Sequence, residues 1–213
     1  MAAIAAAVAL TACGAQRQDV SEPSGKFMVQ TSATFPTTQR LSEHTRMVIK
    51  VRNVDSRPLP NVAVTICNVT CKFPAPPGEG SSAQAFSQYV NQPYAANQSR
   101  PVWVVDKPPG VCSYSCAQGA PGAAVTAYSN TWALGPLKPG ATATFVWGVT
   151  AAKPGTHIVA WEVAAGLNGK ATAAVPSGST PCGAIPCGTF RVKISIAAPH
   201  PYVTDSGKIV NQR

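Results

Sequence analysis

The sequence predicts an all-β fold, an antiparallel β-sandwich built from short strands. Its hydrophobic residues recur with a period of two, as in strands with one buried face, and not with the 3.6-residue period of a helix. The 213 residues include 20 Pro and 17 Gly, which interrupt long helices. Turn-forming combinations of Pro, Gly, Asn and Asp separate the alternating segments. These features exclude a helical bundle and a coiled coil.

Five segments carry the alternation most clearly. In chain order, strands are expected within residues 46–52, 61–66, 142–149, 157–163 and 190–196. In the first of them, Met47, Ile49 and Val51 share one face, and the charged residues share the other. Turns are expected at residues 55–58, 138–140, 153–155 and 167–169. Trp147 and Trp161 fall on apolar faces, so we expect them to anchor a core between two sheets.

The first residues of the chain predict export. MAAIAAAVALTA is an uncharged apolar run that ends at Cys13. It is shorter than the roughly 20 residues that span a bilayer and has the length of a signal-peptide core. Leu10-Thr11-Ala12-Cys13 resembles the lipobox of bacterial lipoproteins. The resemblance implies a signal peptide over residues 1–12, a lipid on Cys13, a flexible tether over residues 13–26, and a protein attached to the extracytoplasmic face of the cell membrane.

The other six cysteines predict disulfides. They form three close pairs, Cys67/Cys71, Cys112/Cys116 and Cys182/Cys187, and thiols oxidise outside the cytosol. Pro and Gly around Cys182 and Cys187 allow the curled chain that a local bridge requires, so this pairing is favoured.

The remaining four cysteines leave the pairing open. A bridge enclosing about 50 residues would stabilise by roughly 4 kcal/mol and a local one by roughly 2 kcal/mol, but local closure forms more readily, and we favour it. The alternative is a zinc site from two C-x3-C pairs. Zinc ribbons usually space these ligands as C-x2-C, and no His adjoins the pairs, so we expect no metal.

Two segments resemble the Ig-like repeat domains of bacterial surface proteins, of the cell-adhesion-related type. They read KVRNVDSRPLPNVAVTI and WALGPLKPGATATFVWGVTAAKPGTHIVAWEV. The resemblance implies an Ig-like antiparallel β-sandwich over residues 27–198, followed by a C-terminal tail over 199–213. It also implies a binding, adhesive or spacer role with no catalytic residue to carry over. The chain departs from such domains in a long disulfide-containing loop insertion over about residues 67–130.

The insertion holds a candidate binding surface. Phe86, Tyr89, Tyr94 and Trp103 lie among Gln and Asn residues. Aromatic rings beside amides suit glycans or peptide surfaces, because a ring stacks while an amide donates and accepts hydrogen bonds. The interpretation that we favour is that these rings pack the long segment onto the sandwich, because a loop of this length needs packing of its own.

The sequence offers little for catalysis. His44, His157 and His200 are isolated, no G-x-S-x-G or glycine-rich phosphate motif occurs, and the eight acidic residues are scattered. We therefore expect neither an enzyme nor a cofactor. Two alternatives stay open: an exported enzyme or enzyme accessory with a spatially assembled site, and the solute-binding lipoprotein of a transporter.

The charge balance points to acidic partners. Seventeen Lys and Arg against eight Asp and Glu give a net charge of +9, spread along the chain without a cluster. This distribution argues against a nucleic-acid groove. A lipid-anchored cationic domain is instead expected to attract anionic headgroups or acidic envelope polymers, with a glycan or a protein as other candidate partners. The alternative, which is equally favoured, is a diffuse positive bias that serves no particular partner.

Overall fold

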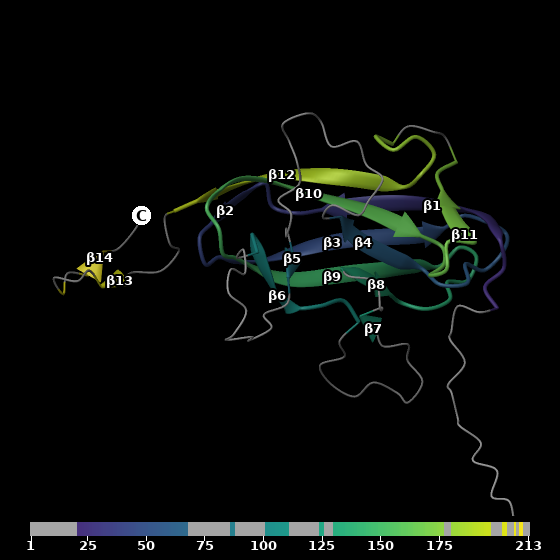
Figure 1. Ribbon diagram of the computed structural model, residues 1–213, viewed down its shortest axis with the longest axis horizontal. Helices are drawn as coiled ribbons and strands as arrows, with labels where there is room; N and C mark the ends of the chain where they lie inside the picture. The colour runs from purple at the N-terminus through teal and green to yellow at the C-terminus, as the bar shows by residue number, and fades with distance from the viewer. Residues whose placement is uncertain are drawn as a thin grey trace, which may run out of the picture.

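The computed structural model describes residues 21–67, 86–87, 101–110, 124–125, 130–176, 180–196, 202–203, 207 and 209–210. These residues form strands and no helices, arranged as two packed six-stranded sheets (Figure 1). The described residues form a β-sandwich whose neighbouring strands run mostly antiparallel, and the parallel pairings among them are β1–β11, β2–β12 and β5–β6. The predicted fold class is confirmed.

The strands of the two sheets come from widely separated parts of the chain. The first sheet contains, in order, β11 (Ala171–Ala174), β1 (Gly25–Thr34), β3 (His44–Asn53), β9 (Thr142–Ala151), β6 (Trp103–Lys107) and β5 (Phe86–Ser87). The second contains β2 (Thr38–Arg40), β12 (Cys187–Ser195), β10 (Gly155–Ala164), β4 (Ala63–Cys67), β8 (Thr131–Ala133) and β7 (Ala124–Val125). A separate hairpin pairs β13 (Tyr202–Val203) with β14 (Ile209–Val210).

The core lies between the two sheets, where the alternating apolar residues meet. Met47, Ile49 and Val51 of β3 are fully buried, as the alternation predicts. Trp147 of β9 and Trp161 of β10 are 0% and 5% exposed, so both are core anchors. Such alternation buries one face of each strand and leaves the other to solvent.

Three boundaries differ from the sequence prediction. Glu22 is buried and β1 begins at Gly25, so residues 21–26 belong to the folded domain and not to a tether. The segment 67–130 is not only a loop, because β6 within it pairs with β9 and completes the first sheet. The tail after residue 198 contributes the β13–β14 hairpin. In the first two cases a segment read as irregular has partners that lie far away along the chain, whereas β13 and β14 pair with each other inside the predicted tail.

Asp55 closes the turn after β3 and carries a strongly perturbed pKa. It accepts hydrogen bonds from the side chain of Arg57 (Nε–Oδ1 3.2 Å), the backbone N–H of Arg57 (3.0 Å) and that of Met28 (3.1 Å). The Arg57 side chain, followed by the two backbone donors, holds the pKa of Asp55 far below its ordinary value. These bonds favour the ionised carboxylate, because each donor binds the charged form more strongly.

Asp55→Asn is therefore expected to change the pH dependence of unfolding. The stabilisation is fully present above about pH 4 and is lost as the pH falls toward the depressed pKa. At neutral pH the variant should unfold with a free energy about 1 kcal/mol below that of the wild type. The difference should shrink as the pH approaches about 2 in urea titrations. A difference that is constant over this range would contradict the assignment.

Candidate functional site

The outer face of the first sheet carries cations and hydroxyl groups. Side chains on alternate positions of β1, β3 and β9 point away from the core. We call this surface the cationic face, and it comprises Gln30, Ser32, Thr34, Arg46, Val48, Lys50, Arg52, Thr142, Thr144 and Val146. The strand pattern predicts its charged residues, since Arg46, Lys50 and Arg52 alternate with the buried residues of β3.

Strand register places polar groups beside each cation. Arg52 lies opposite Gln30 on one side and Thr142 on the other. Lys50 lies opposite Ser32 and Thr144 in the next row. Directly opposed side chains are about 5 Å apart at Cβ, and successive outward residues of one strand are separated by about 7 Å. Two rows of hydrogen-bond donors are therefore presented side by side.

These rows surround an open hollow. Its volume is about 290 Å³, and it is lined by Gln30, Thr31, Ser32, Lys50, Arg52 and Thr142. The lining includes two cations, an amide and three hydroxyl groups but no carboxylate. Within the described part of the chain, neither Lys50 nor Arg52 forms an ion pair. Their charge is therefore available to an anion, which both side chains and the neighbouring hydroxyl groups can bind.

One end of the face holds a histidine–aspartate pair. His44 Nδ1 lies 2.9 Å from Asp106 Oδ2, and the Thr150 hydroxyl donates to the same oxygen at 2.6 Å. The His44 and Asp106 side chains are 57% and 37% exposed. Gly148 makes room for the ring, because a Cβ there would lie 3.3 Å from His44 Cε1. His44 is isolated along the sequence and lies exposed at the start of β3, and strand pairing brings Asp106 to it.

This cluster does not have the geometry of a hydrolytic triad. A triad places the nucleophile on Nε2 of the histidine and the carboxylate on Nδ1. Here the Thr150 hydroxyl is on the carboxylate side, 3.5 Å from Nδ1 of His44. Across the residues described, no group of three or more His, Cys, Asp or Glu is placed to hold a metal ion. The pair orients the imidazole at the edge of the cationic face.

Two of the four predicted surface aromatics are in the core. Phe86 is 1% and Trp103 is 0% exposed, so neither can form a binding surface. Their rings pack edge to face with centroids 5.9 Å apart, and both contact Phe35. For these two residues the binding-surface hypothesis is wrong and the packing interpretation is confirmed, because β5 and β6 are strands of the sheet whose aromatic side chains turn inward. Tyr89 and Tyr94 lie outside the described residues.

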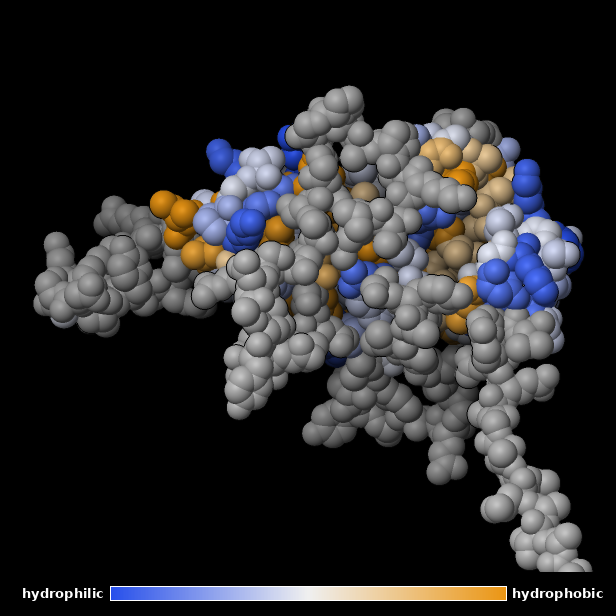
Figure 2. Space-filling view, in the orientation of Figure 1, coloured by the Kyte–Doolittle hydropathy of each residue, from blue (hydrophilic) through white to orange (hydrophobic). Residues whose placement is uncertain are grey.

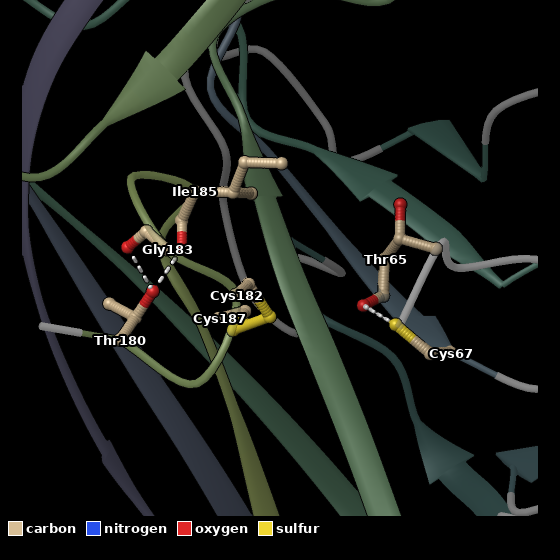
Figure 3. The surroundings of a disulfide bond; sticks show 7 residues. All are labelled: Thr65, Cys67, Thr180, Cys182, Gly183, Ile185 and Cys187. Atoms are coloured by element: carbon tan, nitrogen blue, oxygen red, sulfur yellow. Dashed lines mark hydrogen bonds between the residues drawn. A yellow bond between two sulfur atoms is a disulfide. The ribbon is translucent and has the colours of Figure 1, made fainter. Parts of the chain in front are cut away.

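One predicted disulfide is confirmed. Cys182 and Cys187 are bridged, with their Cα atoms 6.2 Å apart, and Figure 3 shows the loop that they close. The Thr180 hydroxyl lies across this loop, 2.8 Å from the carbonyl oxygen of Gly183 and 2.6 Å from that of Ile185.

Cys67 is also disulfide-bonded, to a partner outside the described residues. The positions predicted for lipidation and for the other bridges also lie outside them, namely Cys13, Cys71, Cys112 and Cys116.

Comparisons with known proteins find similarity at the level of structure alone. No protein-family model and no curated protein matches the chain. A CARDB domain from Pyrococcus furiosus is similar, with 11% identity, 79% of this chain and 95% of that chain covered, and a TM-score of 0.40. A PapD-like domain of a human protein has 10% identity, covers 92% and 96% of the two chains and has a TM-score of 0.34.

An alpha-2-macroglobulin from Salmonella is a third similar structure. It has 12% identity and a TM-score of 0.38, and the match covers 79% of this chain. The chain spans 7% of the length of that protein. No residue of the cationic face takes a role from any of these structures.

Sequence reasoning missed two polar residues that organise the site's surroundings. Gln39 is 1% exposed, accepts a 2.7 Å hydrogen bond from the indole N–H of Trp103, and donates to the carbonyl of Pro36. From the sequence, Asp106 is only one of the scattered acids.

Among the described residues, none of the secondary structure is a helix that could span a bilayer.

Proposed function

We propose that the chain is a lipid-anchored module on the outside of a bacterial cell that binds an anionic envelope polymer without catalysing a reaction. The observation that carries the proposal is the run of Arg46, Lys50 and Arg52 along one strand, flanked by hydroxyl and amide groups. None of these cations is neutralised by an acid among the residues described. Because these three cations belong to one extended strand, their charges form a line across the sheet.

A line of charge suits a polymer better than a compact ligand. Lys50 and Arg52 are about 7 Å apart along β3, and Arg46 lies about 13 Å beyond Lys50, so the three cations can meet separate anionic groups of one extended chain. Each contact is exposed and weak alone, so affinity depends on several contacts acting together. The hydroxyl groups of Ser32, Thr142 and Thr144 add donors to the same anionic oxygens. The binding is therefore expected to weaken with added salt.

The anchoring part of the proposal is supported by the lipobox-like sequence before Cys13. A signal peptide and a lipidated cysteine would place the domain outside the cytoplasm, where disulfides such as Cys182–Cys187 persist. A Cys13→Ser variant should then move from the membrane fraction to the soluble fraction. Retention of this variant in the membrane would contradict the anchor.

The binding part is tested by charge reversal on the full chain. Lys50→Glu/Arg52→Glu is expected to lower the affinity for long-chain polyphosphate at least about tenfold, because two attractive contacts become repulsive. Lys153→Glu/Lys193→Glu makes the same change in net charge on exposed residues away from the face and should leave the affinity within about twofold. Binding can be measured by titration calorimetry at several salt concentrations, with neutral dextran as a control polymer.

Equal losses of polyphosphate affinity in both double variants would show that net charge alone drives binding. That result would contradict the assignment of the cationic face as the binding site. Binding of dextran as tight as that of polyphosphate would overturn the choice of an anionic polymer. Circular dichroism should show unchanged folding for both variants, because the four altered side chains are exposed.

A further inference from the structure

The end of the sandwich where the chain enters the domain is held by a buried carboxylate. Glu22 is 8% exposed, and its Oε1 accepts a hydrogen bond from the backbone N–H of Leu167 at 2.8 Å. Its Oε2 accepts from Leu167 at 2.9 Å and from Asn168 at 3.1 Å. Gly166 lies against the same carboxylate, where any side chain would collide with it. The entering segment is thereby fixed to the loop between β10 and β11.

Because Glu22 is fixed to the domain, only the residues between Cys13 and Glu22 set how far this end of the sandwich can lie from a lipid on Cys13. Residue 22 follows residue 13 by nine positions along the chain. A fully extended chain covers about 3.5 Å per residue, so the tether reaches about 30 Å at most. The opposite end of the sandwich is one strand length further away, about 30 Å for ten-residue strands such as β1 and β3. A lipid on Cys13 therefore keeps the Glu22 end within about 30 Å of the bilayer, and a further attraction is needed to hold that end against the headgroups.

Exposed cations gather at that end. Lys26, Lys138 and Lys170 are exposed, and none forms an ion pair among the residues described. Figure 2 shows hydrophilic residues at the right-hand end of the view, where β1 and β11 begin in Figure 1. These three lysines and Arg57 outnumber the two acids that hydrogen bonds place at this end, Glu22 and Asp55, so the end keeps a positive balance.

Hydrogen bonds show that these segments adjoin one another. The backbone N–H of Gly25 donates to the carbonyl of Lys170 at 3.0 Å, which places Lys26 beside it. Arg57 Nη2 donates to the carbonyl of Lys26 at 2.6 Å. Asn53 Nδ2 donates to the carbonyls of Arg57 and Leu137, each at 2.9 Å. The three lysines thus lie on one continuous end of the domain, connected through the turns that Asn53 joins.

We propose that this tether end, defined by Lys26, Lys138 and Lys170, docks on anionic lipid headgroups. The inference rests on the proposed function, because a lipid on Cys13 is what brings the end to the bilayer. Basic residues attract anionic headgroups only within about a Debye length of the surface. Docking would direct the long axis of the sandwich away from the membrane and leave the cationic face open to the side.

Lysine footprinting of the purified full chain tests the proposal. The chain is mixed with phosphatidylcholine vesicles, or with vesicles that also contain phosphatidylglycerol, and treated with an amine-acetylating ester before mass spectrometry. Acetylation of Lys26, Lys138 and Lys170 is expected to fall at least about threefold on the anionic vesicles only. Lys153 and Lys193, at the opposite end near the start of β10 and the end of β12, serve as internal controls and should change little.

A matched pair of variants supplies the second readout. Lys138→Glu/Lys170→Glu should abolish the protection of Lys26, whereas Lys153→Glu/Lys193→Glu should preserve it. Protection spread equally over both ends, or protection of Lys26 that survives in Lys138→Glu/Lys170→Glu, would overturn the docking.

The same spectra separate this proposal from the anchor proposal. The mass of the N-terminal peptide reports whether Cys13 carries lipid. A lipidated chain whose end lysines react equally on neutral and anionic vesicles would overturn docking and leave the anchor intact. An unlipidated chain with selective protection would support docking while the anchor fails.

Discussion

Trp103→Ala is expected to lower the free energy of unfolding by about 4 kcal/mol, the largest effect of any substitution considered for this domain. The side chain is fully buried and packs against Phe35 and Phe86, with ring centroids 5.4 and 5.9 Å away. Its removal leaves a cavity and also strands the side-chain oxygen of Gln39, which loses its 2.7 Å hydrogen bond inside the core. Urea denaturation followed by circular dichroism measures the loss.

Two further variants separate packing from hydrogen bonding at this position. Trp103→Phe retains a ring but removes the indole N–H, so about half of the destabilisation should remain. Trp103→Phe/Gln39→Leu removes the orphaned amide oxygen but also the hydrogen bond from Gln39 to the carbonyl of the exposed Pro36, so only part of the loss should be recovered. If Trp103→Ala changed the free energy of unfolding by less than about 1 kcal/mol, Trp103 would not be a core residue, and its role as a surface aromatic would be open again.

Asn53→Ala is expected to lower the free energy of unfolding by about 3 kcal/mol. Asn53 is 0% exposed, and its side chain satisfies three backbone groups. Its Nδ2 donates to the carbonyls of Arg57 and Leu137, and its Oδ1 accepts from the N–H of Asp55, all at 2.9 Å. Alanine leaves these groups without their partner in a poorly hydrated turn, and each orphaned group costs about 1 kcal/mol or more.

Asn61 provides a graded control for the same residue type. It is also buried, and its side chain accepts one hydrogen bond, from the N–H of Gly135 at 3.1 Å. Asn61→Ala should therefore destabilise by about 1 kcal/mol in the same urea experiment. Equal losses at the two positions would show that the number of bridged backbone groups does not set the effect.

The alternating strands were predictable, because each residue's burial depends mainly on its place in a period-two pattern. Strand β3 shows this most clearly, with Met47, Ile49 and Val51 inward and Arg46, Lys50 and Arg52 outward. The charged part of the cationic face could therefore be predicted from one segment. Its neighbours could not, because the strand order decides that β1 and β9 bring hydroxyl groups, and not acids, beside the cations.

The unpredicted features all depend on contacts between distant residues. Gln39 and Trp103 are 64 positions apart, His44 and Asp106 are 62 apart, and Glu22 meets Leu167 across 145 positions. A polar side chain in a polar stretch predicts exposure, so the burial of Gln39 and Glu22 has no local signal. The aromatic residues of β5 and β6 were ambiguous for a related reason: these strands have two and five residues, too few to display a period.

The pairing of the first strands with the last has a consequence for folding kinetics. Strand β1 lies beside β11, and β2 lies beside β12, so residues 25–40 find partners within residues 171–195. Closing loops of this length must precede the contacts that stabilise them, which slows folding of domains rich in non-local pairs. Strand β1 therefore lacks its partner β11, and β2 lacks its partner β12, until the C-terminal part of the chain has been synthesised. The pairings of the N-terminal strands with these C-terminal strands are expected to form last.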